Sequence, residues 1–130
     1  MVYQDDCCSA FMDIQPINPG HTLVIPNRHA GRLVDLDEEE GAQMFRVAQR
    51  LAAALYKSEV RCEGVDFFLA DGAAAGQEVF HIHLHIFPRY VGDGFSVRFR
   101  EQTQPSGIER DCRQDKKRAA IEITLFTTQR

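Results

Sequence analysis

The chain has 130 residues, of which 44% are hydrophobic and 26% are charged, and its formal net charge is −4. The negative charge argues against general nucleic-acid binding, and no apolar stretch approaches the length of a membrane span. We therefore expect no nucleic-acid or membrane partner. The length suits one domain over residues 1–130, with its core at about residues 3–95 and a less diagnostic C-terminal tail at 96–130.

The N-terminus is acidic and has neither the basic nor the apolar region of a signal peptide, so we expect a cytoplasmic protein. The four cysteines include no Cys-x-x-Cys pair. Adjacent Cys7 and Cys8 would point to opposite sides of a strand and make a poor disulfide. The expectation is therefore reduced, partly buried cysteines.

Short strands and one strong helix are predicted in chain order. Strands at residues 8–13 and 20–26 are separated by a turn rich in Pro, Gly and Asn. Asp37 begins a helix with capping-box spacing to Glu40, and this helix ends near Ser58. Its apolar stripe is a core face, formed by Met44, Val47, Ala48, Leu51 and Leu55.

Further strands are expected at residues 65–70 and 80–88, followed by a turn at 92–94. A second helix is expected over residues 108–120 in the tail. The order of these elements predicts an α+β fold, in which an antiparallel sheet packs against one main helix and a C-terminal helix follows.

One segment, residues 79–90, carries three histidines that alternate with apolar residues. A period of two is typical of a half-buried strand, so His81, His83 and His85 should share the face opposite the core. The apolar side chains expected to face the core are Phe80, Ile82, Leu84 and Ile86.

Three interpretations of this histidine row are open. The rings are ordinary surface or core residues, or they bind a metal, or one of them is a nucleophile. A strand rises roughly 3.3 Å per residue, so the outer two histidines lie roughly 13 Å apart and at most two neighbours share one zinc ion. A metal site completed by residues elsewhere stays open. We favour the nucleophile, because a neutral imidazole with a pKa of about 6.5 attacks phosphorus near neutral pH.

The loop before the histidine row, residues 71–78, is built mainly from small residues. Small residues let backbone N–H groups approach a ligand closely and form a concave anion site. A glycine-rich turn alone is usually only a turn. Placed directly before three histidines, this loop is a candidate phosphate-binding loop.

Residues 81–87 match the pattern His-φ-His-φ-His-φ-φ, where φ is apolar. This is the motif of the histidine triad family of nucleotide hydrolases and transferases, which the chain resembles. Residues 76–80, Gly-Gln-Glu-Val-Phe, are similar to the same segment in bacterial members, and residues 11–26 followed by His29 agree with a second family block. The resemblance spans roughly residues 3 to 95 and implies a HIT-like fold and a homodimer formed through the main helix and a neighbouring strand.

The resemblance also implies a catalytic role for each histidine of the row. His83 would attack the α-phosphorus of a purine nucleotide and form a nucleotidyl-histidine, which water then hydrolyses. His81 would orient His83 through its backbone carbonyl. His85 would contact the phosphate or the bridging oxygen, and a histidine at this third position resembles the hydrolase branches, because transferase branches carry Gln there.

The resemblance further implies a set of nucleotide-binding residues. Asp13 would accept hydrogen bonds from both ribose hydroxyls, and two apolar neighbours would flank the base. His21 is expected to support the His81 side chain, and His29 to be a surface residue. The full nucleotide-binding set is Phe11, Asp13, Ile14, Gln77, Glu78 and Val79.

Two positions depart from the family pattern. Ala70 stands where many members carry Asn or Gln, and Glu78 stands where some carry Ser or Thr. Without an N-terminal Cys-x-x-Cys we expect no structural zinc, and no metal or cofactor is needed for the reaction. The expected function is a nucleotide phosphoramidase or dinucleoside polyphosphate hydrolase. The alternative is a purine nucleotide-binding module with little turnover.

Overall fold

The structure, a computed structural model, describes residues 1–96. Residues Met1–Ser96 form one compact unit. The helix expected over residues 108–120 lies outside the described residues. Among residues 1–96, no helix is both long enough and apolar enough to cross a membrane.

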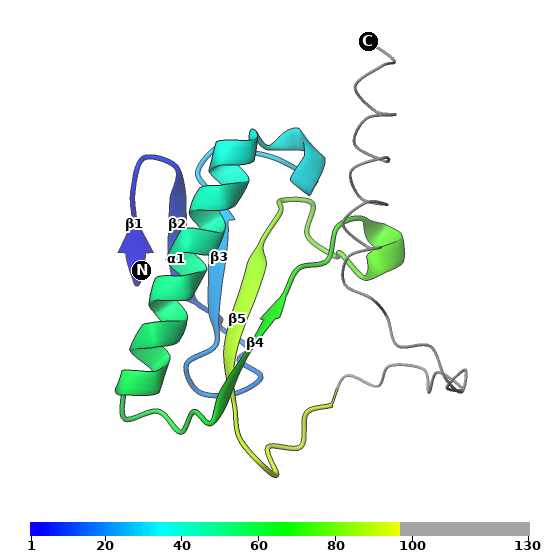
Figure 1. The fold of residues 1–130 in the computed structure, drawn as a ribbon. Helices are drawn as coiled ribbons and strands as arrows, with labels where there is room; N and C mark the ends of the chain where they lie inside the picture. Colours follow the sequence, from blue (N-terminus) through cyan, green and yellow to red (C-terminus); the bar gives the residue numbers. More distant parts are fainter. Residues whose placement is uncertain (97–130) are drawn as a thin grey trace, which may run out of the picture. The chain divides into compact units, whose positions relative to one another are not determined.

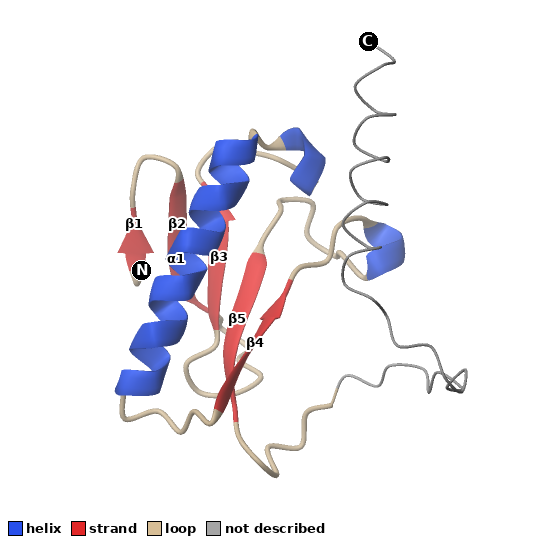
Figure 2. Cartoon of the chain, viewed as in Figure 1, coloured by secondary structure: helices blue, strands red, loops and turns tan. Residues whose placement is uncertain are grey.

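A five-stranded antiparallel sheet carries one long helix on one face (Figure 1). The strand order is β1-β2-β3-β5-β4, so β4 forms one edge. The strands are β1 (Tyr3–Gln4), β2 (Cys8–Met12), β3 (Thr22–Pro26), β4 (Gly64–Phe68) and β5 (Leu84–Arg89). The helix is α1 (Glu38–Lys57), and short 3-10 turns lie at η1 (Leu33–Asp35) and η2 (Ala73–Ala75). The predicted α+β fold with one main helix is confirmed (Figure 2).

The helix forms where its sequence predicts. Asp37 is the N-cap residue, and its backbone N–H donates to the Glu40 carboxylate at 2.9 Å. The apolar stripe of α1 packs on the sheet, since Met44, Val47 and Ala48 are buried in one cluster with side chains of β2, β3 and β5. Burial of each large apolar side chain contributes about 1.5–3 kcal/mol, which attaches α1 to the sheet.

The strand expected at residues 80–88 is shorter than predicted. It begins at Leu84, so His81 and His83 lie in the segment just before β5. The pairing of β3 with β5 stops at Val24 opposite Leu84, and β3 ends two residues later at Pro26, which has no N–H to donate.

The alternation of burial nevertheless continues into the segment before β5. Ile82 and Leu84 are buried, while the alternating residues His81, His83 and His85 are half-buried. The N–H of Ile82 donates to the Ala30 carbonyl at 2.7 Å and so attaches this segment to the loop after β3. The prediction was wrong for Phe80, whose side chain is 58% exposed because it lies beyond the paired region.

The cysteines that the structure describes are free. Cys7 is exposed and Cys8 is buried in the main core cluster, as expected for neighbours that point to opposite sides. Cys62 is half-buried. The fourth cysteine, Cys112, lies outside the described residues.

The turn that leads into β3 depends on Gly20. Its φ is +98°, a conformation that L side chains rarely adopt, and an added Cβ would lie 3.0 Å from Leu55 Cδ2 near the end of α1. The turn therefore passes close to the helix and places the next residue, His21, against the end of the sheet.

We expect Gly20→Ala to lower the free energy of unfolding by roughly 1–3 kcal/mol, because it combines an unfavourable φ with a close contact. Urea unfolding followed by circular dichroism measures this change. Gly41→Ala is the matched control: Gly41 is helical, has nothing within 4 Å of an added Cβ, and should become more stable by about 0.5–1 kcal/mol. Equal stability changes in the two variants would contradict the strain at Gly20.

Candidate active site

The histidines lie on the sheet face opposite α1. Leu84 and Ile86 of β5 are buried in the core cluster beneath the helix, so the alternating residue His85 points to the other face. In the register of the sheet, His85 lies opposite Leu23 of β3 and Phe68 of β4. Directly opposed residues share a face, so these two side chains border the site.

His83 has the geometry of a nucleophile. Its Nδ1 lies 2.8 Å from the backbone carbonyl of His81, and a carbonyl only accepts, so Nδ1 carries the proton. The other nitrogen, Nε2, therefore holds the free lone pair. This is the contact that the family resemblance implies for the first histidine of the row.

His81 is held by two contacts of its own. Its Nε2 donates to the Pro26 carbonyl at 3.1 Å, and its Nδ1 lies 3.2 Å from His29 Nδ1, which is therefore the donor. The rings of His29 and His81 stack with centroids 5.3 Å apart. His29 is exposed, as expected, but it also orients His81. No sequence pattern pairs positions 29 and 81, because two separate loops form this contact.

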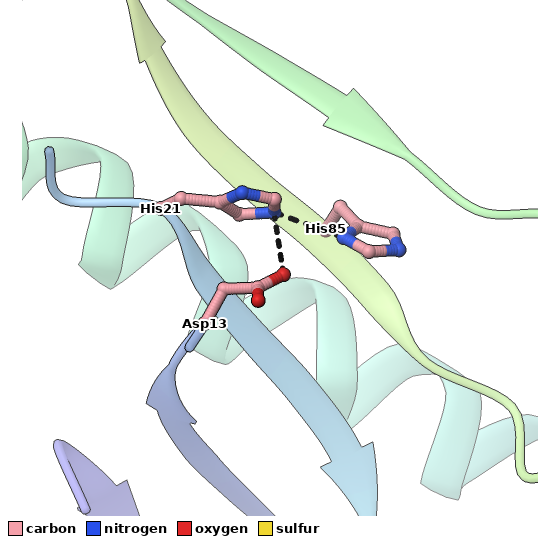
Figure 3. A group of neighbouring side chains, drawn as sticks. All are labelled: Asp13, His21 and His85. Carbon is pink, nitrogen blue, oxygen red and sulfur yellow. Dashed lines mark hydrogen bonds and ion pairs between the residues drawn. The ribbon is translucent and has the colours of Figure 1, made fainter. Parts of the chain in front are cut away.

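His21 contacts the opposite end of the row from the one predicted. We expected it beside His81, but its Nε2 lies 2.9 Å from His85 Nδ1 (Figure 3). The register explains the difference: Leu23 pairs with His85, so a residue two positions before Leu23 lies beside the far end of the row. The His21 ring is 2% exposed and also packs on Phe87 at 5.1 Å.

Burial lowers the pKa of His21, which keeps its ring neutral. Burial also lowers the pKa of His85 to about 4, and the neighbouring His83 and His21 add to that effect. His85 is therefore neutral at pH 7.

Asp13 sits beside the same cluster. Its Oδ1 accepts the Gln15 N–H at 2.8 Å, which is ordinary turn chemistry. Its Oδ2 lies 3.6 Å from His21 Nε2 (Figure 3). Close in sequence, Phe11 is half-buried, whereas the Ile14 side chain is 95% exposed and makes little contact with its own chain. The carboxylate and these two apolar side chains are the expected ribose and base contacts.

The loop before the row is held together by Gln77, whose expected role needs correction. Its side chain is buried: Oε1 accepts the Gly72 N–H at 2.7 Å, and Nε2 donates to the carbonyls of Gly31 and Val79. Its own N–H donates to Gly72 O at 3.2 Å. Gln77 therefore has no donor left for a ligand, and it supports the loop instead.

The two following residues of the loop remain available. Glu78 is exposed and Val79 is 63% exposed, and within residues 1–96 neither N–H is engaged in a hydrogen bond. Sequence reasoning missed one neighbour of the site, Phe68, whose ring is 48% exposed and 5.9 Å from the His85 ring. Its sequence signal is weak, because only the register places it next to His85.

Among the described residues, the side chains of Asp13, His21 and His85 come close enough to hold a metal ion, with ligand atoms within 4.8 Å of one another. The hydrogen bonds do not fit that use. The Ile17 N–H donates to His21 Nδ1 at 3.1 Å, so the His21 proton lies on Nε2, the atom that would have to bind the metal. The same atom donates to His85 Nδ1, the second potential ligand. The cluster fits a hydrogen-bond chain better than a metal site.

Fold and geometry together define a small α+β protein with a site lined by oriented histidines. The HIT domain family model matches residues 1–92. A HIT-like protein of Borreliella burgdorferi is 41% identical over 98 residues, which cover 75% of this chain and 70% of that protein. Solved structures similar to this chain include two HIT-family proteins. A zinc-bound histidine triad family protein of Mycobacterium smegmatis is 42% identical with a TM-score of 0.70, over 78% of this chain and 73% of that one. A HIT-family protein of Bacillus subtilis is 33% identical with a TM-score of 0.73, and the match covers 93% of this chain and 84% of that one.

This chain belongs to the HIT family. Membership of the family supports a nucleotide-binding or hydrolase-type activity in general.

We expect Gln77→Leu to lower the free energy of unfolding by roughly 1–3 kcal/mol, because it leaves the Gly72 N–H and two carbonyls without their partner. Chemical denaturation gives the value. Gln49→Leu, at an exposed position on α1, is the control and should change stability by no more than about 0.5 kcal/mol. A similar loss in both variants would mean that Gln77 does not hold the loop.

Proposed function

We propose that this protein is a nucleotide hydrolase that cleaves at the α-phosphate of purine nucleotide derivatives through a nucleotidyl-histidine intermediate. The observation that carries the proposal is the orientation of His83. Its Nδ1–H is held by the His81 carbonyl, so the lone pair lies on the other ring nitrogen, Nε2. A neutral, oriented imidazole is the nucleophile that this reaction requires.

The surrounding groups suit a bound nucleotide. In the proposed pose the ribose lies at Asp13, the base lies between Phe11 and Ile14, and the phosphate lies against the N–H groups of Glu78 and Val79. The backbone donors lie before His83 in the chain, whereas the ribose and base contacts come from the β2 side of the sheet. The α-phosphorus would then lie over the histidine row.

In the proposed reaction, His83 Nε2 forms a bond to the α-phosphorus as the bond to the leaving group breaks. His85 donates a hydrogen bond to a phosphate or bridging oxygen and so stabilises the developing charge. A water molecule then attacks the phosphorus, releases the nucleoside monophosphate and restores His83. Positioning and electrostatics supply most of the catalysis, as is usual for phosphoryl transfer.

We also propose that the protein acts as a homodimer joined through α1 and a neighbouring strand. In support, β4 is an edge strand with an exposed aromatic residue, Phe67 at 46%. The helix also exposes Phe45 at 55% and Tyr56 at 57%. Exposed aromatic side chains of this kind are frequent at interfaces between proteins.

Replacement of His83 by Asn or Ala should abolish turnover and leave mononucleotide binding largely intact. Substrate labelled at the α-phosphate and quenched in denaturant should leave label on the wild-type protein and none on the variant. An active His83→Ala protein would exclude the proposed intermediate. A wild type that binds mononucleotide and hydrolyses none of a panel of phosphoramidates, diadenosine polyphosphates and adenylylsulfate would be the nucleotide-binding module instead.

We expect Asp13→Ala to weaken binding of AMP much more than binding of its 2′,3′-dideoxy analogue. Two charge-assisted hydrogen bonds are lost only with the ribonucleotide, and each is worth about 1.5–3 kcal/mol. Isothermal titration calorimetry with both ligands provides the comparison. If both ligands lost the same affinity, Asp13 would be a turn residue and not a ribose-binding one.

A further inference from the structure

Arg32 brings a positive charge to the candidate phosphate-binding loop, residues 71–78. The loop itself carries two carboxylates, Asp71 and Glu78, and neither Lys nor Arg. Arg32 comes from the segment after β3, and its guanidinium lies against Gly72, where an added Cβ would be 3.3 Å from Arg32 Nη2. Because Gly72 has no side chain and a φ of +96°, the guanidinium approaches the loop backbone directly.

The backbone around Arg32 is fixed, although its side chain is 57% exposed. The N–H of Arg32 donates to Asp35 Oδ2 at 2.9 Å. The preceding carbonyl, that of Gly31, accepts from the buried Gln77 amide at 2.7 Å. The oxygen of the same amide accepts the Gly72 N–H. The backbones of Arg32 and the loop are therefore joined by Gln77, without a contribution from the Arg32 side chain.

The Arg32 side chain makes one exposed ion pair, from Nε to Asp71 Oδ1 at 3.1 Å. Within residues 1–96, its four terminal N–H groups have no hydrogen-bond partner. An exposed ion pair of this kind shifts an equilibrium by at most about fivefold. A phosphate group can instead accept two parallel hydrogen bonds from a guanidinium. Phosphate can therefore displace the single bond to Asp71.

The segment that carries Arg32 runs along the His81 end of the histidine row. His29, three residues before Arg32, contacts His81, whereas Asp13 lies at the His85 end, beside the ring that His85 contacts. In the proposed pose the ribose lies at Asp13 and the α-phosphorus lies over the row. Any further phosphate then extends toward the His81 end and the loop before it, where Arg32 lies.

We propose that Arg32 binds the phosphate that follows the α-phosphate, and that Asp71 occupies Arg32 until this phosphate arrives. The inference rests on the proposed nucleotide pose and adds to it a binding residue outside the histidine row. In the free protein Arg32 pairs with Asp71. In the complex the terminal N–H groups of Arg32 bond to the second phosphate, and the Asp71 carboxylate acts as a competitor that lowers the affinity for it.

The test compares AMP with α,β-methylene-ADP, whose bridging carbon resists cleavage, by isothermal titration calorimetry. The Kd for AMP divided by the Kd for α,β-methylene-ADP, here called the phosphate ratio, measures the contribution of the second phosphate. We expect a phosphate ratio of about ten for the wild type, the effect of one hydrogen bond between charged groups. The Kd for AMP also reports whether each variant is folded.

Two variants break the same ion pair and should change the phosphate ratio in opposite directions. Arg32→Gln removes the contact to the second phosphate, so the ratio should fall about tenfold, to near one. Asp71→Asn removes the competitor, so the ratio should rise about two- to fivefold. A purely structural ion pair would have the same effect in both variants, and that result would overturn the inference.

The double variant separates competition for Arg32 from simple charge repulsion. If Asp71 acts by holding Arg32, Asp71→Asn should leave the phosphate ratio unchanged once Arg32 is Gln. A higher ratio in the double variant would mean that Asp71 only repels phosphate, and would overturn the proposed exchange. Arg28→Gln is the matched control, because Arg28 lies in the same segment, is 50% exposed and pairs with Glu40. It should keep the wild-type ratio.

Failure of the proposed function would give a different result from failure of this inference. A wild type that binds neither AMP nor α,β-methylene-ADP would refute the nucleotide pose and the inference with it. A wild type that binds both ligands equally well would overturn the inference alone. The same holds for an Arg32→Gln variant that keeps both its AMP affinity and the wild-type phosphate ratio.

Discussion

The site depends on backbone groups that determine which nitrogen of each imidazole ring carries the proton. The Pro26 carbonyl accepts from His81, the His81 carbonyl accepts from His83, and the Ile17 N–H donates to His21. A carbonyl can only accept and an amide N–H can only donate, so each contact specifies which ring nitrogen carries the proton. Because backbone groups do not titrate, these proton positions are part of the fold.

The two ends of the histidine row differ as a result. At one end, His81 rests on His29 in an exposed contact between loops. At the other end, His85 rests on the buried ring of His21 and has a pKa of about 4. In the row, His81 is supported by His29, His83 has a free lone pair on Nε2, and His85 carries an N–H on Nε2. Three chemically identical side chains acquire different properties from their neighbours.

The pairing of β5 with β3 ends before the first two histidines of the row, His81 and His83. Pairing of β3 with β5 stops at Val24 and Leu84, and in the segment before β5 the His81 carbonyl accepts from the ring of His83. The segment is instead fixed by the bond from Ile82 to Ala30 and by the buried amide of Gln77. These hydrogen bonds keep the segment before β5 in place, although it no longer pairs with a strand.

The sequence by itself determined the helix, the approximate strands and the face that carries the histidines. These depend on local patterns: the capping residue Asp37, the apolar stripe of α1, and the alternation around Ile82 and Leu84. The family motif also indicated the contact between the His83 ring and the His81 carbonyl, because both groups belong to the same few residues.

Only the tertiary structure decided which histidine supports which. His21 and His29 lie more than fifty residues before the row, and the strand register assigns the first to His85 and a loop contact assigns the second to His81. The same applies to Gln77, whose amide bonds to backbone groups of its own loop and to the distant Gly31 carbonyl, and to Phe68, which lies opposite His85 on the neighbouring strand. Such pairings depend on register and burial, which arise when distant segments pack, and no local pattern in the chain encodes them.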